Sequence, residues 1–190
     1  KIETFLRNWL RLKRTSSKTI YHFSMHNFDQ NELQTFISEG VIKRFFKYGD
    51  ALINVGAKFS TSQRAIAIAE RYQQGVYAAV GLHPIHLAED IKEEIILGGK
   101  NYSFTTRKEE LDINKYRRLA KSSKKVVAVG ETGLDYFYLD KFSAVEAKKL
   151  KIQQAETLKS FIGLAEELSL PIIFHCRGTK IDNYGAYDDL

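Results

Sequence analysis

The stretch VVAVGETGLDYF, residues 126–137, places four apolar residues before a glycine and a carboxylate, Glu131. A short apolar run without alternation is typical of a strand in a parallel sheet that is covered on both faces. The glycines around Glu131 permit a sharp backbone turn and leave room for a ligand or an ion. The stretch therefore predicts a buried strand that ends at a functional carboxylate.

Three further apolar runs have the same character, and helical patterns lie between them. The runs are ALINVG (51–56), VYAAVGL (76–82) and PIIFHC (171–176). Helices are predicted at residues 31–47, 60–74, 111–121 and 143–168, and the last is clearest because its core-facing positions recur at spacings of three and four. The alternation of strands and helices predicts an α/β fold. The polar middle of residues 87–125 predicts an exposed loop insertion.

The composition is that of one globular domain. The 190 residues are 44% hydrophobic and 27% charged, which is enough for a core and argues against disorder. No apolar run approaches the ~20 residues that span a bilayer, so we expect no membrane partner, and we expect no obligate protein partner. The single cysteine, Cys176, fits a reducing, cytoplasmic compartment. The net charge of +6 fits either a polyanionic partner or a lysine-rich solvated surface.

Candidate chemical groups follow three of the predicted strands. His83 comes after VYAAVGL, Glu131 after VVAVG, and His175 within the end of PIIFHC. The carboxyl ends of parallel strands share one face of a sheet or barrel, so we expect these three side chains to converge there. A cluster of histidine and carboxylate suits Zn, Mn or Mg. Such an ion can generate hydroxide from bound water and can polarise a phosphoryl or carbonyl oxygen.

Each of these residues also has a structural interpretation. Glu131 could pair with Lys124 or Lys125. His83 could donate to a backbone carbonyl and fix the turn that follows it, and His175 could be a satisfied core histidine. The coincidence of three such residues at three strand ends favours the functional interpretation.

Other candidates are weaker. His86, Asp135 and Arg177 lie a few residues beyond the strand ends and could line the same mouth. Arg177 is the best phosphate partner among them, because its planar guanidinium fits a phosphate bidentately, although a surface salt bridge explains it equally well. His22 and His26 have the i, i+4 spacing of a helical metal pair, but the surrounding sequence is not clearly helical.

Four ordered motifs resemble the TatD family of metal-dependent deoxyribonucleases. They are INVGAKFSTSQRAIAIAERY, VYAAVGLHP, VVAVGETGLDYF and LAEELSLPIIFHCR, and the resemblance runs over residues 28–190. It implies a TIM-barrel-like (β/α)8 fold with two divalent metal ions (Zn, Mg or Mn). It further implies hydrolysis of phosphodiester bonds in DNA by a metal-activated water, as an exonuclease on single-stranded ends.

The resemblance also suggests roles for individual residues. Glu131 matches the family's bridging metal carboxylate and His175 matches a histidine ligand, so both are expected to be catalytic and metal-binding. His83 matches the GLHP histidine near the active-site mouth, and Arg177 matches a basic residue after the histidine. We expect His83 and Arg177 to bind substrate.

The sequence departs from the family pattern at both ends. The family's first strand ends in His-x-His, which occurs nowhere in this chain. Residues 1–27 are therefore expected to be an atypical extension or a remodelled first strand. Residues 28–190 would form a partial barrel domain, truncated after about five β/α units and without the later histidine and aspartate. Alternatives are a metallohydrolase of a small amide, ester or lactone, and a non-catalytic fragment.

Overall fold

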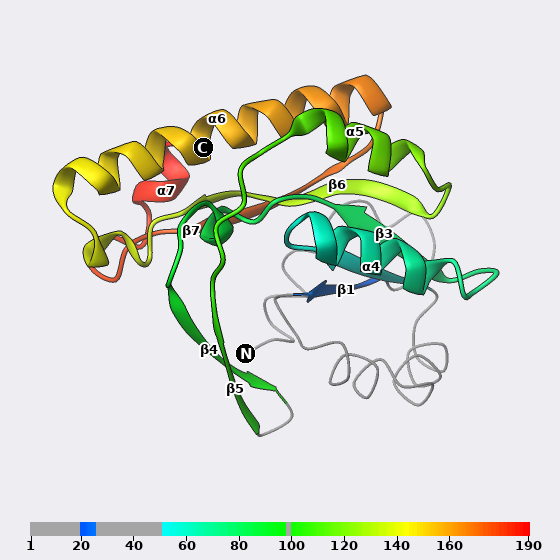
Figure 1. Ribbon diagram of the computed structural model, residues 1–190, viewed down its shortest axis with the longest axis horizontal. Coiled ribbons are helices and arrows are strands. Elements are labelled where there is room, and N and C mark those ends of the chain that lie inside the picture. Colours follow the sequence, from blue (N-terminus) through cyan, green and yellow to red (C-terminus); the bar gives the residue numbers. More distant parts are fainter. Residues whose placement is uncertain (1–19, 26–50, 98–99) are drawn as a thin grey trace.

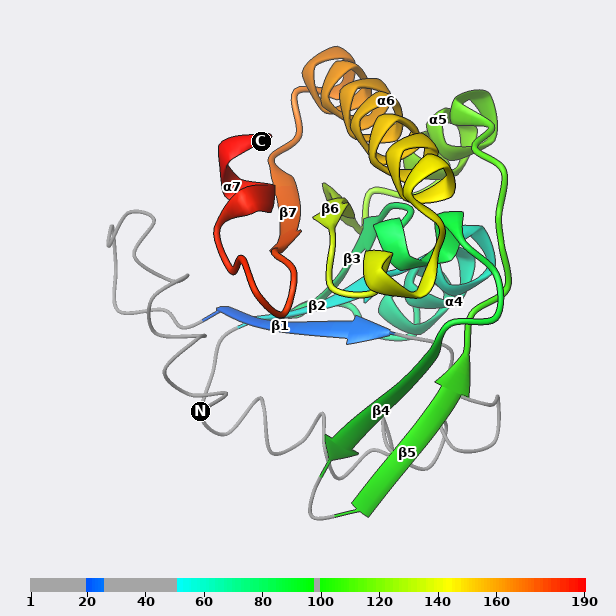
Figure 2. The ribbon, with the colours of Figure 1, turned by 90° about the vertical axis from the view of Figure 1, so that its left-hand side faces the viewer.

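A curled sheet of five parallel strands forms the centre of the molecule (Figure 2). The computed structural model describes residues 20–25, 51–97 and 100–190. The strand order is β1-β2-β3-β6-β7, so each strand lies beside its predecessor in the sheet. The strands are β1 (Ile20–Met25), β2 (Ala51–Gly56), β3 (Val76–Val80), β6 (Val126–Asp135) and β7 (Ile172–Arg177). This curled, all-parallel order confirms the predicted TIM-barrel-like α/β class.

Helices follow β2, β3 and β6 and pack against the outer face of the sheet (Figure 1). They are α4 (Phe59–Ala69), α5 (Ile113–Lys121) and α6 (Ala144–Leu168), with a short α7 (Gly185–Asp188) after β7. Two 3-10 turns, η1 (Pro84–Leu87) and η2 (Leu139–Lys141), follow β3 and β6. None of the helices within these ranges is long and apolar enough to cross a lipid bilayer.

The apolar residues of the strands fill two layers. Toward the helices, Val76 and Ala78 of β3 pack with Ile66 and Ala69 of α4. On the inner face, β2, β3, β6 and β7 each contribute one residue to a separate buried cluster, namely Val55, Ala79, Ala128 and Ile173. An inner layer with one side chain per strand is how a (β/α)8 barrel fills its interior. Burial on both faces explains why these strands read as continuous apolar runs.

Helix α6 confirms the clearest of the helix predictions. Ser143 caps its first turn by accepting from the backbone N–H of Glu146, whose carboxylate accepts from the N–H of Ser143. Ser169 ends the helix in the left-handed conformation (φ 53°). The buried face includes Leu158 and Phe161, as the spacing predicted.

Other segments differ from the predictions. Residues 92–105 contain an antiparallel hairpin of β4 (Lys92–Leu97) and β5 (Lys100–Thr105), where an exposed loop was predicted, and it projects from the body (Figures 1 and 2). The helix predicted at 60–74 begins at Phe59 and ends at Ala69. His22 lies on strand β1, so it does not form the helical pair considered for it. The helix predicted at residues 31–47, and His26, lie outside the described residues.

Candidate functional site

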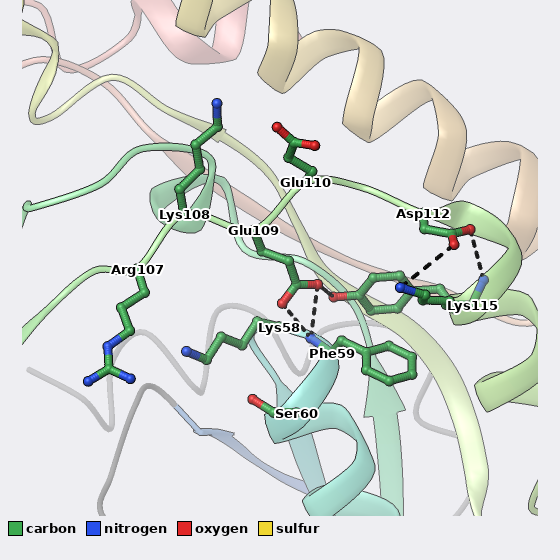
Figure 3. Close-up of a pocket in the computed structure, with 10 residues that line it drawn as sticks. Lys58, Phe59, Ser60, Arg107, Lys108, Glu109, Glu110, Asp112 and Lys115 are labelled. Carbon is green, nitrogen blue, oxygen red and sulfur yellow. Dashed lines mark hydrogen bonds and ion pairs between the residues drawn. The ribbon is translucent and has the colours of Figure 1, made fainter.

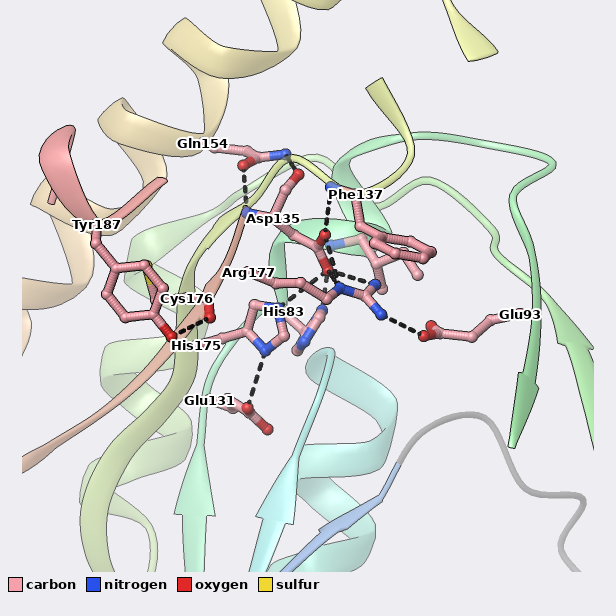
Figure 4. A network of polar contacts seen from close by, with 11 residues as sticks. His83, Glu93, Glu131, Asp135, Phe137, Gln154, His175, Cys176, Arg177 and Tyr187 are labelled. Atoms are coloured by element: carbon pink, nitrogen blue, oxygen red, sulfur yellow. Dashed lines mark hydrogen bonds and ion pairs between the residues drawn. The ribbon is translucent and has the colours of Figure 1, made fainter. Parts of the chain in front are cut away.

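The three candidate residues predicted from the strand ends lie together on the inner face of the sheet (Figure 4). Glu131 projects from β6 and His175 from β7, and Glu131 Oε1 lies 3.2 Å from His175 Nδ1. His83 follows β3, and its ring centroid is 4.0 Å from that of His175. Parallel strands that share one register thus bring together residues from three distant parts of the chain.

Asp135 completes the cluster. It is the last residue of β6, four positions after Glu131, and therefore on the same face of the strand. Its Oδ2 lies 3.0 Å from His175 Nε2, so the imidazole sits between two carboxylates. The Asp135 side chain is only 2% exposed. The sequence predicts Asp135 at the mouth of the site and does not single it out as a candidate metal ligand.

The donor atoms fit a divalent metal ion. His83, Asp135 and His175 each offer one ligand atom, and these atoms lie within 4.8 Å of one another. Two imidazole nitrogens and a carboxylate oxygen are ligands typical of zinc and of related divalent ions. Glu131 adds a second carboxylate beside His175.

The charges of the cluster are coupled. Burial lowers the pKa of His175, but its hydrogen bonds with Asp135 and Glu131 outweigh that effect and raise the pKa to about 9. Burial raises the pKa of Asp135, yet the contacts with His175 and Arg177 hold it below its usual value. In the absence of an ion the carboxylates thus surround a positive charge, and because metals bind neutral imidazole, a metal ion would replace that proton.

Arg177 is held by two carboxylates. Its guanidinium donates to both oxygens of Asp135 at 2.7–3.0 Å and to Glu93 Oε1 of β4 at 2.9 Å. It also lies over the rings of Phe137 and Tyr138, 4.7 and 5.1 Å from their centroids. Arg177 therefore orients Asp135 and ties the hairpin to the site. The substrate-binding role expected for it stays a prediction.

The glycines beside Glu131 allow β6 and β7 to approach closely. Gly133 lies opposite His175 in the register and has φ +153°. A Cβ at Gly133 would come 1.9 Å from the carbonyl oxygen of His175. Gly130, with φ +136°, approaches the backbone of Ile173 in the same way. The glycines of GETGLD thus keep an extended strand close to its neighbour rather than ending it.

Helix α6 fixes the backbone of Asp135 through one buried side chain. Gln154 Oε1 accepts from the Asp135 N–H at 2.8 Å, and Gln154 Nε2 donates to the Asp135 carbonyl at 3.0 Å. We expect Gln154→Leu to lower the free energy of unfolding by about 1–3 kcal/mol, because it leaves buried backbone groups of Asp135 without a partner. Urea denaturation measures this, with Gln153→Leu on the same helix as the control. Equal stability of the two variants would contradict this account of Gln154.

The structure also bears on the alternative interpretations. Lys125 Nζ donates to the carbonyls of Tyr72 and Gln73, so it is not the partner of Glu131. His83 caps η1, where its Nδ1 accepts from the N–H of Ile85 at 3.2 Å, so it fixes the turn after β3 as well as facing His175. His86 lies fully buried within the same turn.

Comparisons with known proteins add to this geometry. The model of a family described as "TatD related DNase" matches residues 20–189. The chain is 33% identical over 133 residues to the uncharacterized metal-dependent hydrolase YabD of Bacillus subtilis, covering 70% of this chain and 41% of that protein. It is 33% identical over 138 residues to the 3'-5' ssDNA/RNA exonuclease TatD of Erwinia tasmaniensis, covering 72% and 43%. The chain thus spans less than half the length of these relatives.

Proposed function

The chain belongs to the TatD-related DNase family, and from that premise we propose that it is a metal-dependent hydrolase of phosphodiester bonds in DNA. The observation that carries the proposal is the convergence of His83, Asp135 and His175, with Glu131 at 3.2 Å from His175. Histidines and carboxylates on neighbouring parallel strands are the groups a divalent metal ion needs.

In this proposal the side chains of the cluster hold up to two divalent ions. His83, Asp135 and His175 would supply ligand atoms for one ion, and the carboxylate of Glu131, which lies 3.2 Å from His175, would help to hold a second. When bound, such an ion lowers the pKa of a water molecule to about 7 and polarises a phosphoryl oxygen. Catalytic roles for Glu131 and His175 follow from their place in this ligand set.

The remaining residues keep the ligands in position. Arg177 donates to Asp135 and fixes the direction of its carboxylate, while Gln154 holds the backbone of the same residue. Gly133 permits β7 to lie close enough for His175 to reach both carboxylates. Ligands that their neighbours orient in this way bind metal more tightly than isolated ones.

The proposed substrate is a single-stranded nucleic acid end, cleaved as an exonuclease would cleave it. Support comes from the name of the Erwinia relative and from the net charge of +6. Mononucleotide release from a labelled single-stranded oligonucleotide tests the proposal. We expect release with added Mn²⁺ or Zn²⁺, none after treatment with a chelator, and recovery when metal is restored.

A substrate panel separates this activity from hydrolysis of a small amide, ester or lactone. A nuclease should lose activity steeply as salt is added, because cations of the salt compete for the phosphates. Turnover of a small ester without cleavage of DNA would overturn the proposed substrate. Cleavage that persists unchanged in chelator would overturn the metal-dependent mechanism.

A further inference from the structure

A cavity of about 320 Å³ lies between the start of α4 and the segment that leads into α5 (Figure 3). One wall is the start of α4, at Lys58 and Ser60, and the other is the segment from Arg107 to Lys115 that leads into α5. Lys58 follows the carboxyl end of β2, so the cavity opens on the same side of the sheet as the metal ligands.

Two backbone hydrogen bonds connect both walls to the turn that carries His83. The N–H of His83 donates to the carbonyl of Ala57 at 2.8 Å, next to Lys58. The N–H of Glu109 donates to the carbonyl of His86, also at 2.8 Å. The cavity is therefore adjacent to the site in the fold, and a strand bound at one can reach the other.

Three carboxylates line the cavity, those of Glu109, Glu110 and Asp112, and that of Glu109 is already engaged. Glu109 accepts from the backbone N–H of Phe59 at 3.1–3.2 Å and from the hydroxyl of Tyr116 at 2.6 Å. It serves as the cap of α4 and as the anchor of the Tyr116 ring. The Phe59 N–H and the Tyr116 hydroxyl, rather than a cation, therefore fix the position of the Glu109 carboxylate.

Among the basic residues that line the cavity, Lys115 pairs with Asp112 at 4.0 Å, whereas Lys58 and Arg107 form no such pair within the described residues. Lys58 Nζ, the Arg107 guanidinium and the Ser60 hydroxyl point to the same side of Glu109 (Figure 3). Neither Lys58 nor Arg107 forms a side-chain hydrogen bond or ion pair with any residue in ranges 51–97 and 100–190. Burial lowers the pKa of Lys58, and although Glu109 opposes this, the charges of Arg107 and Arg64 add to it. Lys58 and Arg107 line the same cavity and repel each other, and an anion bound between them would relieve that repulsion.

We propose that Lys58, Arg107 and the hydroxyl of Ser60 form a subsite for a backbone phosphate of the nucleic acid strand whose reacting phosphodiester lies at the metal ligands. Arginine fits a phosphate bidentately, lysine adds a point charge, and a serine hydroxyl is a common phosphate donor. This proposal rests on the proposed function. It gives the nucleic acid strand a second point of contact with the protein, in addition to the metal ligands. Holding a neighbouring phosphate fixes the register of the strand without reading its sequence.

Fluorescence anisotropy of a short labelled single-stranded oligonucleotide, measured in chelator at several salt concentrations, tests the subsite. We expect Arg107→Ala to weaken binding roughly tenfold. We also expect it to reduce the slope of log affinity against log salt by about 0.7, the value for one lost contact to a single-strand phosphate. Lys58→Ala should act in the same direction. Lys159→Ala, an exposed position of α6, removes the same charge elsewhere and should change neither quantity.

The outcomes separate the subsite from the proposed chemistry. Wild-type affinity and slope in both variants, or no binding by the unaltered chain, would overturn the subsite. Hydrolysis of a small phosphodiester by the unaltered chain with Mn²⁺ tests the chemistry alone, because that substrate has no second phosphate. Arg107 is exposed, and a melting curve shows that the variant is folded.

Discussion

Replacing Asp135 by asparagine is expected to lower metal affinity and phosphodiester hydrolysis by at least about 100-fold, because losing even a residue that only supports a metal ligand costs roughly 10- to 100-fold. Asp135 is buried and acts on three groups at once. Its carboxylate contacts His175 at 3.0 Å, accepts from Arg177, and accepts from the N–H of Phe137 at 3.1 Å. An amide has a similar shape, but it lacks the negative charge that a divalent ion needs.

The measurement is metal content after dialysis, together with the rate of hydrolysis at saturating Mn²⁺. Asp140→Asn is the matched control, because Asp140 is exposed and, within the described part of the chain, pairs only with Lys180, at 3.0 Å. Removing one partner from a buried charged group also destabilises a protein. If Asp135→Asn is not folded, Glu131→Gln provides the second variant. Wild-type metal content and rate in a folded variant would show that these carboxylates hold no ion.

Four of the strands and the convergence of their ends could be predicted, because a parallel strand that is buried on both faces appears in the sequence as a continuous apolar run. Four apolar runs matched β2, β3, β6 and β7, and the register then placed Glu131 3.2 Å from His175. The sequence of strand β1, IYHFSM, is not a continuous apolar run, although the strand pairs with β2 along its whole length. Apolar runs thus identify the strands of the core better than those that carry polar residues.

Predicting the place of Asp135 in the candidate site depends on how far β6 extends. The composition of GETGLD, which is typical of a turn, predicts that the strand ends at Gly130, whereas β6 continues to Asp135. Alternation along the longer strand would have placed Glu131 and Asp135 on one face. Gly130 and Gly133 do provide space, as the sequence predicts, but that space is taken by the backbone of the neighbouring strand β7.

The partners of Arg177 could not be predicted from the sequence at all. Glu93 reaches it from the hairpin, 84 residues earlier in the chain. The residues of β4 and β5 are largely polar, and a two-stranded ribbon is marginally stable without packing partners. Its position depends on tertiary contacts such as the Arg177–Glu93 pair, and local sequence carries no signal for these.

Gly133→Ala is expected to have the largest effect on stability, with a loss of roughly 2–6 kcal/mol in the free energy of unfolding. Backbone strain at a positive φ accounts for about 1–3 kcal/mol of this, and overpacking for about 1–3 kcal/mol. The added methyl carbon would lie 1.9 Å from the carbonyl oxygen of His175, a backbone atom that cannot rotate away. The two strands must separate there, which would also move the His175 ring from Glu131 and Asp135.

Gly163→Ala is the matched control for this prediction. Gly163 lies within α6, is exposed, and has no atom within 4 Å of an added Cβ. Alanine there should stabilise the chain by about 0.5–1 kcal/mol, because it favours the helix. Urea denaturation should therefore show that Gly133→Ala lowers the free energy of unfolding and that Gly163→Ala raises it, although both substitutions add the same methyl group. A Gly133→Ala variant as stable as the unaltered chain would mean that β6 and β7 do not approach as closely as the structure has them, and His175 would then lose its place between the two carboxylates.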